Sequence, residues 1–128
     1  MSRLTTVWGE TLNPDAVLQE YPRPQLVRGS YLNLNGWWDY AITGSDEIPV
    51  RYDGKILVPF SPEAPLSGVN RTLLPGQVLW YRRTLNVMAQ PGKRLLLHIG
   101  AADQRARVYL NGMLLSEHVG GYTAFTVE

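Results

Sequence analysis

The sequence predicts an all-β fold, specifically a β-sandwich, and three segments with alternating apolar residues support this prediction. They span residues 37–43, 78–87 and 94–118, and a period of two is typical of strands that bury one face. A chain of 128 residues, with 45% hydrophobic and 18% charged residues, has an ordinary globular composition. That length suits one domain with a single core.

Charge and composition exclude several classes of partner. The formal net charge is only +1, and the cationic residues are scattered along the chain, so a nucleic-acid partner is not expected. The chain contains no cysteine, which excludes disulfides and thiolate metal sites. It also has no apolar run long enough for a membrane span or, near Met1, for a secretory signal. The sequence therefore predicts no membrane partner and a cytoplasmic location.

Residues 1–28 are predicted to form an N-terminal arm, and residues 29–128 the sandwich. The arm is expected to be extended, with at most one helical turn near residues 15–19, because prolines interrupt it. These prolines are Pro14, Pro22 and Pro24. The arm is also apolar enough to dock on another surface, with Trp8, Val17, Leu18 and Tyr21 as the expected anchors.

The first strand is expected at residues 37–43, after Asn35-Gly36. Its alternation assigns Trp38, Tyr40 and Ile42 to the core and Trp37, Asp39 and Ala41 to the opposite face. An aromatic residue on that face can stack on a sugar or pack under another layer. We favour packing for Trp37 and keep sugar stacking as the alternative.

A long irregular loop follows the next strand. The short strand, residues 56–58, should end at Pro59, because proline cannot donate a ladder hydrogen bond. Residues 59–77 contain four prolines and two glycines. A loop of this length in a compact domain is usually functional or covers an interface.

Residues 78–87 form the longest predicted strand. Arg83 interrupts the apolar set of this strand, so its charge should meet a carboxylate or reach the sheet edge. Glu63 and Asp103 are the alternative partners.

The clearest local signal is the pair Asn111-Gly112, which predicts a type I′ hairpin. A two-residue turn there places three pairs opposite one another, namely Leu110 with Met113, Val108 with Leu115, and Ala106 with Glu117. One face would then be apolar, and Leu95, Leu97 and Ile99 would join it in the core.

No catalytic or metal site is predicted within these residues. Ser61 and Ser67 lack the Gly-x-Ser-x-Gly turn that exposes a nucleophile. His98 and His118 have no third ligand of a suitable type nearby, and Asp46-Glu47 are expected to be solvated. We expect His118 to cap the loop at Gly120-Gly121, where glycines permit close backbone crossing.

Four motifs, in a consistent order over about ninety-five residues, resemble the amino-terminal sugar-binding domain of glycoside hydrolase family 2, the β-galactosidase and β-glucuronidase family. The most specific lies in residues 101–125, where Val-Tyr-x-Asn-Gly is followed by His-x-Gly-Gly-Tyr-Thr-x-Phe. The other three are LNGWWDY at 34–40, VPFSPEAPLSGV at 58–69 and LWYRRTLNV at 79–87.

The resemblance implies a jelly-roll sandwich, similar to galactose-binding domains, in a retaining glycosidase. The catalytic glutamates of that family lie on a separate barrel, so this chain alone should be inactive and should contact barrel and immunoglobulin-like domains. In related β-galactosidases an asparagine of the loop corresponding to residues 59–77 helps to bind the sugar, and Asn70 is the best match. Any Mg²⁺ or Na⁺ would belong to the barrel, and no cofactor is implied here.

Two alternative functions remain open: an independent carbohydrate-binding module using Trp37 or Trp80, and a purely structural interaction domain. The sequence ends inside an expected strand, which predicts a sandwich incomplete at its C-terminus. Exposed strand edges would then favour self-association of the isolated chain.

Overall fold

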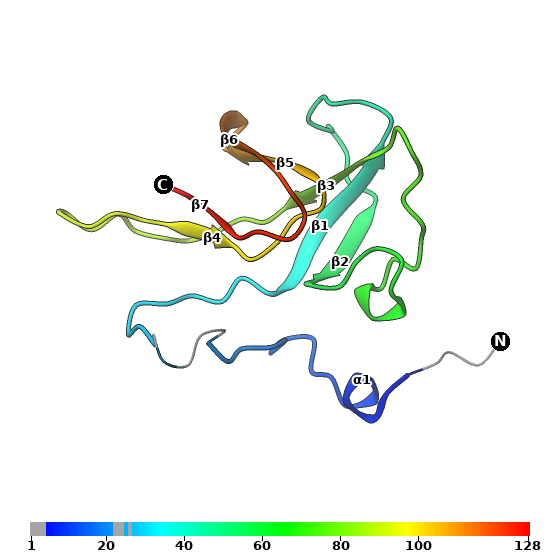
Figure 1. Cartoon of the computed structure of the whole chain (residues 1–128), viewed down its shortest axis with the longest axis horizontal. Helices are drawn as coiled ribbons and strands as arrows, with labels where there is room; N and C mark the ends of the chain where they lie inside the picture. Colours follow the sequence, from blue (N-terminus) through cyan, green and yellow to red (C-terminus); the bar gives the residue numbers. More distant parts are fainter. Residues whose placement is uncertain (1–4, 22–24, 26) are drawn as a thin grey trace. The chain divides into compact units, whose positions relative to one another are not determined.

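The computed structural model describes residues 5–21, 25 and 27–128, and the arm residues Pro22 and Pro24 lie outside them. Seven strands dominate the described residues, accompanied by the short helix α1 (Val7–Glu10) and the 3₁₀ turn η2 (Pro65–Ser67) (Figure 1). The prediction of an all-β fold is confirmed. In the described part of the chain, no helix has the length and apolar character needed to cross a membrane.

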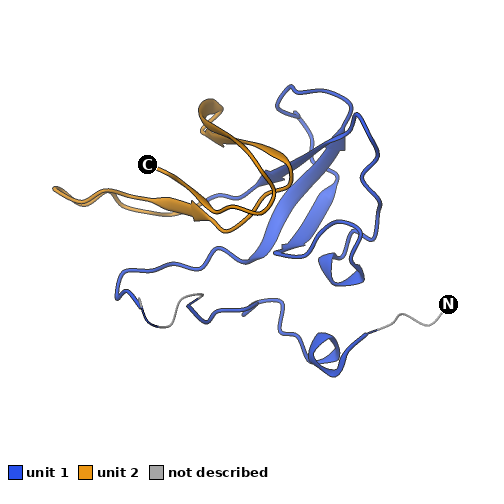
Figure 2. Cartoon of the chain, viewed as in Figure 1, with its two compact units in different colours: residues 1–84 blue, residues 85–128 orange. Residues whose placement is uncertain are grey.

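The chain divides into two compact units, residues 1–84 and residues 85–128 (Figure 2). The first unit contains a three-stranded antiparallel sheet. Its strands β1 (Gly36–Thr43), β2 (Gly54–Val58) and β3 (Val78–Arg82) are arranged in the order β2–β1–β3. The prediction of strands near residues 37–43 and 56–58 is thus confirmed.

Both faces of this sheet carry buried residues, which corrects the predicted core face of β1. Ala41, assigned to the opposite face, is only 1% exposed, whereas Trp38, Tyr40 and Ile42 are half-buried. Ile56, paired with Trp38, is fully buried. The sequence pattern missed this because alternation identifies one apolar face of a strand and does not show whether the opposite face is buried as well.

A row of charged side chains crosses the sheet at Asp39. The carboxylate of Asp39 accepts from Lys55 Nζ at 2.6 Å and from Arg82 Nη2 at 2.9 Å. These cations stand on the neighbouring strands directly opposite Asp39. The Arg82 guanidinium also lies 3.9 Å from the centre of the Tyr52 ring. The hydrogen bonds from Lys55 and then Arg82 lower the pKa of Asp39 below its ordinary value of 3.8.

Strand β3 ends at Arg82, so the prediction of one long strand over residues 78–87 is wrong beyond that point. Pairing with β1 stops at Asp39 opposite Arg82. The next residue, Arg83, donates from Nη1 to the main-chain carbonyls of Leu34 at 2.6 Å and Asn35 at 3.2 Å. The predicted carboxylate partners Glu63 and Asp103 are therefore wrong, since carbonyl oxygens satisfy this guanidinium.

The arm differs from its prediction in the position of its helical turn. Helix α1 begins after Thr6, whose hydroxyl accepts from the Gly9 main-chain N–H at 3.2 Å. No helix forms at residues 15–19, because the Asn13 side chain accepts from the Asp15 N–H and makes a local turn instead.

Of the predicted anchors of the arm, Val17 is the buried one. It is fully buried, and its carbonyl accepts from the Asn35 side chain at 3.3 Å. Tyr21 packs edge-on against Tyr31, with ring centres 4.7 Å apart. Trp8 is 78% exposed and Leu18 50% exposed, so the arm is held mainly at Val17.

The second unit consists of two antiparallel strand pairs. Strand β4 (Leu97–Ile99) pairs with β7 (Phe125–Val127), and β5 (Arg105–Leu110) pairs with β6 (Met113–Val119). Of the residues predicted to fill the core beside β5, Leu97 and Ile99 are half-buried. Leu95 precedes β4 and is exposed, so its assignment to the core was wrong.

The turn between β5 and β6 lies at Asn111-Gly112, as the sequence predicts. Both residues have positive φ, +50° and +84°, as a type I′ turn requires. Leu110 faces Met113 as expected, but the register shifts between Val108 and Tyr109. A bulge at Leu115 therefore places Ser116 opposite Val108, and the two predicted pairs further from the turn are wrong.

The bulge brings Glu117 opposite Arg107. Glu117 accepts from Arg105 Nε at 2.5 Å and from Arg107 Nε at 3.3 Å. The hydrogen bond from Arg105 is the main cause that lowers the pKa of Glu117, and the bond from Arg107 adds to it. The cross-strand cluster ties the open end of the hairpin together.

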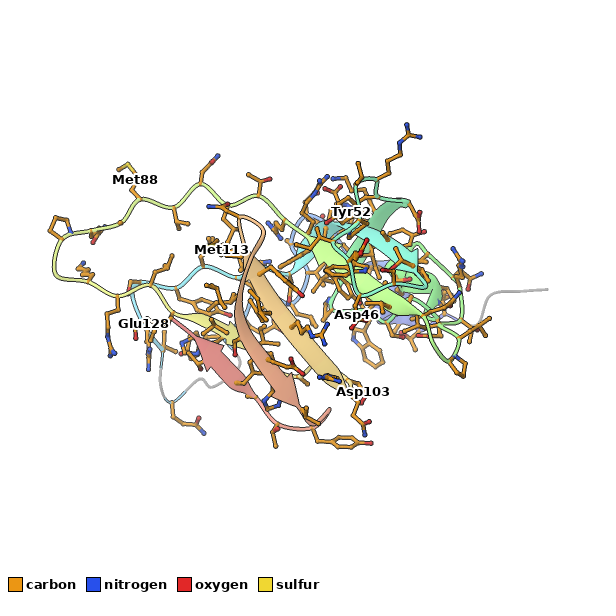
Figure 3. The ribbon with its side chains drawn as sticks, turned by 90° about the horizontal axis from the view of Figure 1, so that it is seen from above. Asp46, Tyr52, Met88, Asp103, Met113 and Glu128 are labelled. Atoms are coloured by element: carbon orange, nitrogen blue, oxygen red, sulfur yellow. The ribbon has the colours of Figure 1, made fainter. Side chains whose placement is uncertain are left out.

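The apolar side of the hairpin is less buried than the alternation predicts. Leu110, Met113 and Leu115 are exposed, while Ala106 and Val108 are half-buried. A two-stranded ribbon offers too little neighbouring surface to cover a whole face. Met88, in the same unit, is exposed as well, and its side chain projects away from the ribbon (Figure 3).

The segment after β6 makes the close crossing expected from Gly120-Gly121. His118 Nε2 lies 3.2 Å from both the Gly120 carbonyl and the Thr123 hydroxyl, and its ring stacks on Phe125 with centres 4.3 Å apart. A Cβ atom at Gly121 would collide with the carboxylate of Asp103. A side chain at residue 121 would therefore force the Asp103 side chain to move.

The substitution Gly121→Ala should lower the free energy of unfolding by about 0.5–1.5 kcal/mol, the cost of forcing the Asp103 side chain away from its preferred rotamer. The added methyl group would meet the Asp103 side chain at contact distances that real Cβ atoms avoid. Gly100→Ala is the matched control in the same unit, because nothing lies within 4 Å of its Cβ position. Urea unfolding of the variants measures the difference, and equal losses would contradict the steric explanation.

The substitution Asp39→Asn should lower the free energy of unfolding by about 0.5–1 kcal/mol near neutral pH, the range of well-formed surface ion pairs. Because the folded-state pKa of Asp39 lies below 3.8, its contribution is present above that pH and is lost as the pH falls through the lower folded value. Unfolding followed from neutral pH to about pH 3 should therefore show a shallower acid loss in the variant. The exposed Asp15, substituted Asp15→Asn, serves as control, and identical pH profiles of the Asp39 variant and the unsubstituted chain would rule out this role.

Candidate functional site

The loop of residues 59–77 is the candidate site, and its own hydrogen bonds define its shape. It leaves β2 at Pro59, passes through η2 and reaches β3 at Val78. The main-chain N–H of Arg71 donates to the Pro62 carbonyl at 2.8 Å. The N–H of Leu73 donates to Glu63 Oε1 at 3.0 Å. These two bonds join the limbs of the loop on either side of η2.

Ser67 organises the centre of the loop. This residue is fully buried, and its hydroxyl lies 2.7 Å from the Ala64 carbonyl and 3.4 Å from that of Pro62. The same oxygen accepts from the Val69 main-chain N–H at 3.0 Å. Ser67 therefore has a structural role at the centre of the loop.

Asn70 is exposed and has a left-handed backbone conformation, with φ of +53°. Asparagine tolerates this region better than most residues. The hydrogen bonds that the main-chain N–H groups of Val69, Arg71 and Leu73 donate fix the backbone around it. An exposed amide offers two donors and one acceptor, which suits the hydroxyl groups of a sugar. The assignment of Asn70 to sugar binding stays a prediction.

Glu63 is the ionisable residue that braces the loop. The main-chain N–H of Leu73 is the first cause of its lowered pKa, followed by its own main-chain N–H and by the hydroxyl of Ser61. Glu63 is thus held as an anion that accepts hydrogen bonds. No sequence pattern indicates this role, because the contact with Leu73 spans ten residues of irregular chain.

Trp37 and Trp80 have structural partners within the first unit. A Cβ atom added at Gly68 would lie 3.6 Å from the Trp37 indole ring, so this part of the loop lies close to the ring. The indole N–H of Trp80 donates to the Thr43 hydroxyl at 3.0 Å. Trp37 nevertheless stays 42% exposed. These contacts favour packing over sugar stacking.

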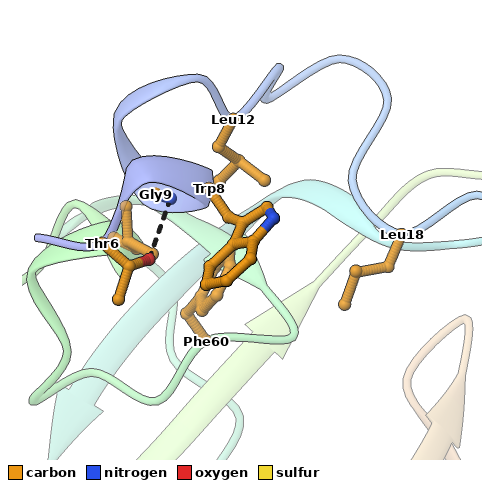
Figure 4. A pocket seen from close by; sticks show the side chains of 7 residues that line it. Thr6, Trp8, Gly9, Leu12, Leu18 and Phe60 are labelled. Carbon is orange, nitrogen blue, oxygen red and sulfur yellow. Dashed lines mark hydrogen bonds between the residues drawn. The ribbon is translucent and has the colours of Figure 1, made fainter.

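An apolar pocket of about 230 Å³ lies between helix α1 and the loop. Figure 4 shows the side chains of Trp8 and Phe60 at this pocket. The other lining residues are Thr6, Gly9, Leu12, Leu18 and Leu66. The hydroxyl of Thr6 is already used to cap α1, so the pocket offers little to a sugar. The sequence predicted Trp8 as an anchor of the arm, but the residue stays largely exposed, and no sequence pattern indicated that it would share a pocket with Phe60 and Leu66.

The histidines lie apart from the loop in sequence and have local partners. His98 Nδ1 is 2.8 Å from the Thr126 hydroxyl across the β4–β7 pair. His118 belongs to the glycine crossing described above. Within the described residues, no group of three or more His, Cys, Asp or Glu side chains is placed to hold a metal ion.

Comparison with known proteins gives a consistent class of relatives. The chain is 30% identical over 126 positions to a β-glucuronidase of Canis lupus familiaris, covering 84% of the chain and 19% of that protein. It is 25% identical over 111 residues to a β-glucuronidase of Streptococcus agalactiae, covering 84% of the chain and 18% of that protein. It is also 35% identical over 78 residues to the β-galactosidase BoGH2A of Bacteroides ovatus, covering 60% and 9% respectively.

No family model matches the chain. The chain spans less than a fifth of the length of these curated relatives. The relatives are glycosidases by name, and the chain is therefore similar to a limited part of β-glucuronidases and β-galactosidases.

Proposed function

We propose that the chain forms the non-catalytic amino-terminal domain of a retaining glycosidase of glycoside hydrolase family 2. The observation that carries this proposal is the alignment of 84% of the chain with two β-glucuronidases several times its length. The all-β fold agrees with the jelly-roll sandwich expected of such a domain. In this proposal, residues 29–128 form the sugar-binding domain and residues 1–28 its arm.

Hydrolysis in this proposal takes place on polypeptide outside the chain. A retaining glycosidase uses two carboxyl groups, one as nucleophile and one as acid and base. A barrel domain would provide them at the C-terminal ends of its strands. The parent protein would act on β-galactosides, β-glucuronides or β-mannosides, and any Mg²⁺ or Na⁺ would bind in the barrel. The 128 residues alone would not hydrolyse a glycoside.

In this proposal the barrel carries out the hydrolysis, and the loop of residues 59–77 forms part of the rim of the sugar pocket. The support is the braced backbone around Asn70 and the exposure of its amide. The barrel and an immunoglobulin-like domain would be its partners within the same protein. The exposed apolar side chains of the β5–β6 hairpin support contacts with these domains or with a second copy of the protein.

The test is to assay the longer protein containing this chain on a panel of chromogenic β-glycosides. One of the galactoside, glucuronide or mannoside substrates should be hydrolysed with retention of anomeric configuration. Absence of all three activities would overturn the proposed parent enzyme. Sugar binding by the 128 residues alone, with no activity in the longer protein, would instead favour an independent carbohydrate-binding module.

Replacing Asn70 with glycine should raise KM about tenfold, because one hydrogen bond to the substrate is worth roughly 1–1.5 kcal/mol. Glycine accepts the positive φ of this residue, so Asn70→Gly removes the amide without straining the backbone. The exposed residue Asn86, changed as Asn86→Gly, is the matched control. Equal KM values for both variants and the unsubstituted enzyme would remove Asn70 from the substrate site.

A further inference from the structure

We propose that Glu63 is a positioning residue that holds the Asn70 amide in place for sugar binding, although Glu63 itself does not touch the sugar. This inference rests on the proposed role of Asn70 and extends it to the residue that orders the loop. The first observation is the bond from the Leu73 main-chain N–H to Glu63 Oε1 at 3.0 Å.

The position of this bond is what gives Glu63 its role. Asn70 lies in a short segment whose backbone is tied on three sides. Val69 donates to Ser67, Arg71 to Pro62, and Leu73 to Glu63. Two of these three acceptors have little freedom to move, because Ser67 is fully buried and Pro62 accepts through its main-chain carbonyl. Glu63 is the side chain that bridges the two limbs.

The physical effect is a reduction in the conformational freedom that sugar binding must overcome. An exposed loop tied by one fewer bond samples more conformations, and ordering it on binding costs free energy. Asn70 has a φ of +53°, which asparagine adopts more readily than most residues, so its own backbone preference agrees with the conformation that these bonds hold. The Glu63–Leu73 bond therefore contributes to holding the amide in one orientation before the sugar arrives.

The chemistry of the carboxylate suits this role. An anionic acceptor makes a stronger bond to a main-chain N–H than a neutral one. The Leu73 N–H, the main-chain N–H of Glu63 and the Ser61 hydroxyl lower the pKa of this carboxyl group, which favours the anionic acceptor. Glutamine keeps a side-chain oxygen that can accept from the Leu73 N–H, whereas alanine removes this acceptor. Comparing the two substitutions therefore shows whether the hydrogen bond, rather than the negative charge, is needed.

The experiment is a double-mutant cycle in the longer, active protein, with the β-glycoside that it hydrolyses as the probe. Glu63→Ala should raise KM about three- to tenfold with kcat within about twofold, because a contact of equal strength in ground and transition states changes KM alone. Glu63→Gln should stay within about twofold of the unsubstituted enzyme. In the Asn70→Gly background, Glu63→Ala should add less than about twofold, because the amide it positions is gone.

The outcomes distinguish this inference from the proposed function. If Asn70→Gly raises KM but Glu63→Ala does not, or if the two effects multiply, the positioning role is overturned and the Asn70 contact stands. If Asn70→Gly has no effect, the Asn70 contact fails, and the positioning role fails with it. The exposed Glu47, changed as Glu47→Ala, controls for loss of a surface carboxylate.

A second variant keeps the test decisive if Glu63→Ala fails to fold. Glu63→Asp keeps the charge but shortens the side chain by one methylene, so its oxygen should not reach the Leu73 N–H. It should also raise KM at unchanged kcat, and a KM equal to that of the unsubstituted enzyme would overturn the positioning role. The thermal midpoint of each variant confirms that it is folded.

Discussion

The pairing of β1 along both of its edges is the constraint on which the first unit depends. β1 hydrogen-bonds to β2 over its first half and to β3 over its second half, and the two sets of pairs overlap at Asp39 and Tyr40. Asp39 stands at this overlap with a cation from each neighbouring strand. The register of both neighbours is thereby fixed at one point, and the loop between β2 and β3 has its two ends anchored to the same central strand.

The anchoring explains how an irregular segment can present a side chain reproducibly. Loops usually carry function because a rigid scaffold holds their ends. Here the scaffold fixes the ends, and the bonds of Pro62, Glu63 and Ser67 fix the interior. The arm adds a further contact to the first unit, since Val17 is fully buried.

The sequence could predict features whose cause is local and could not predict those whose cause is distant. Asn111-Gly112 specifies its turn because both residues must have positive φ, and period-two alternation locates β1. No local sequence pattern indicates the bulge at Leu115. The bulge shifts the register, so the residues of β6 beyond it pair with other residues of β5 than predicted. Arg83 was expected to meet a carboxylate or to reach the sheet edge, but the main-chain carbonyls of Leu34 and Asn35, just before β1, accept its hydrogen bonds. Asn70 was singled out through resemblance alone, and the brace by Glu63 became visible only in three dimensions.

The internal bonding of the loop between Pro62 and Leu73 has a consequence for how such a segment can change. Its conformation is specified largely by its own residues, so it behaves as a self-contained insert between two strands. Length changes should be absorbed at its outer end, where Pro75-Gly76 form a separate turn closed by the Gln77 N–H on the Leu74 carbonyl. Chains with this sheet can therefore differ in the length of the insert, and with it in the reach of its tip, while the sheet itself stays unchanged.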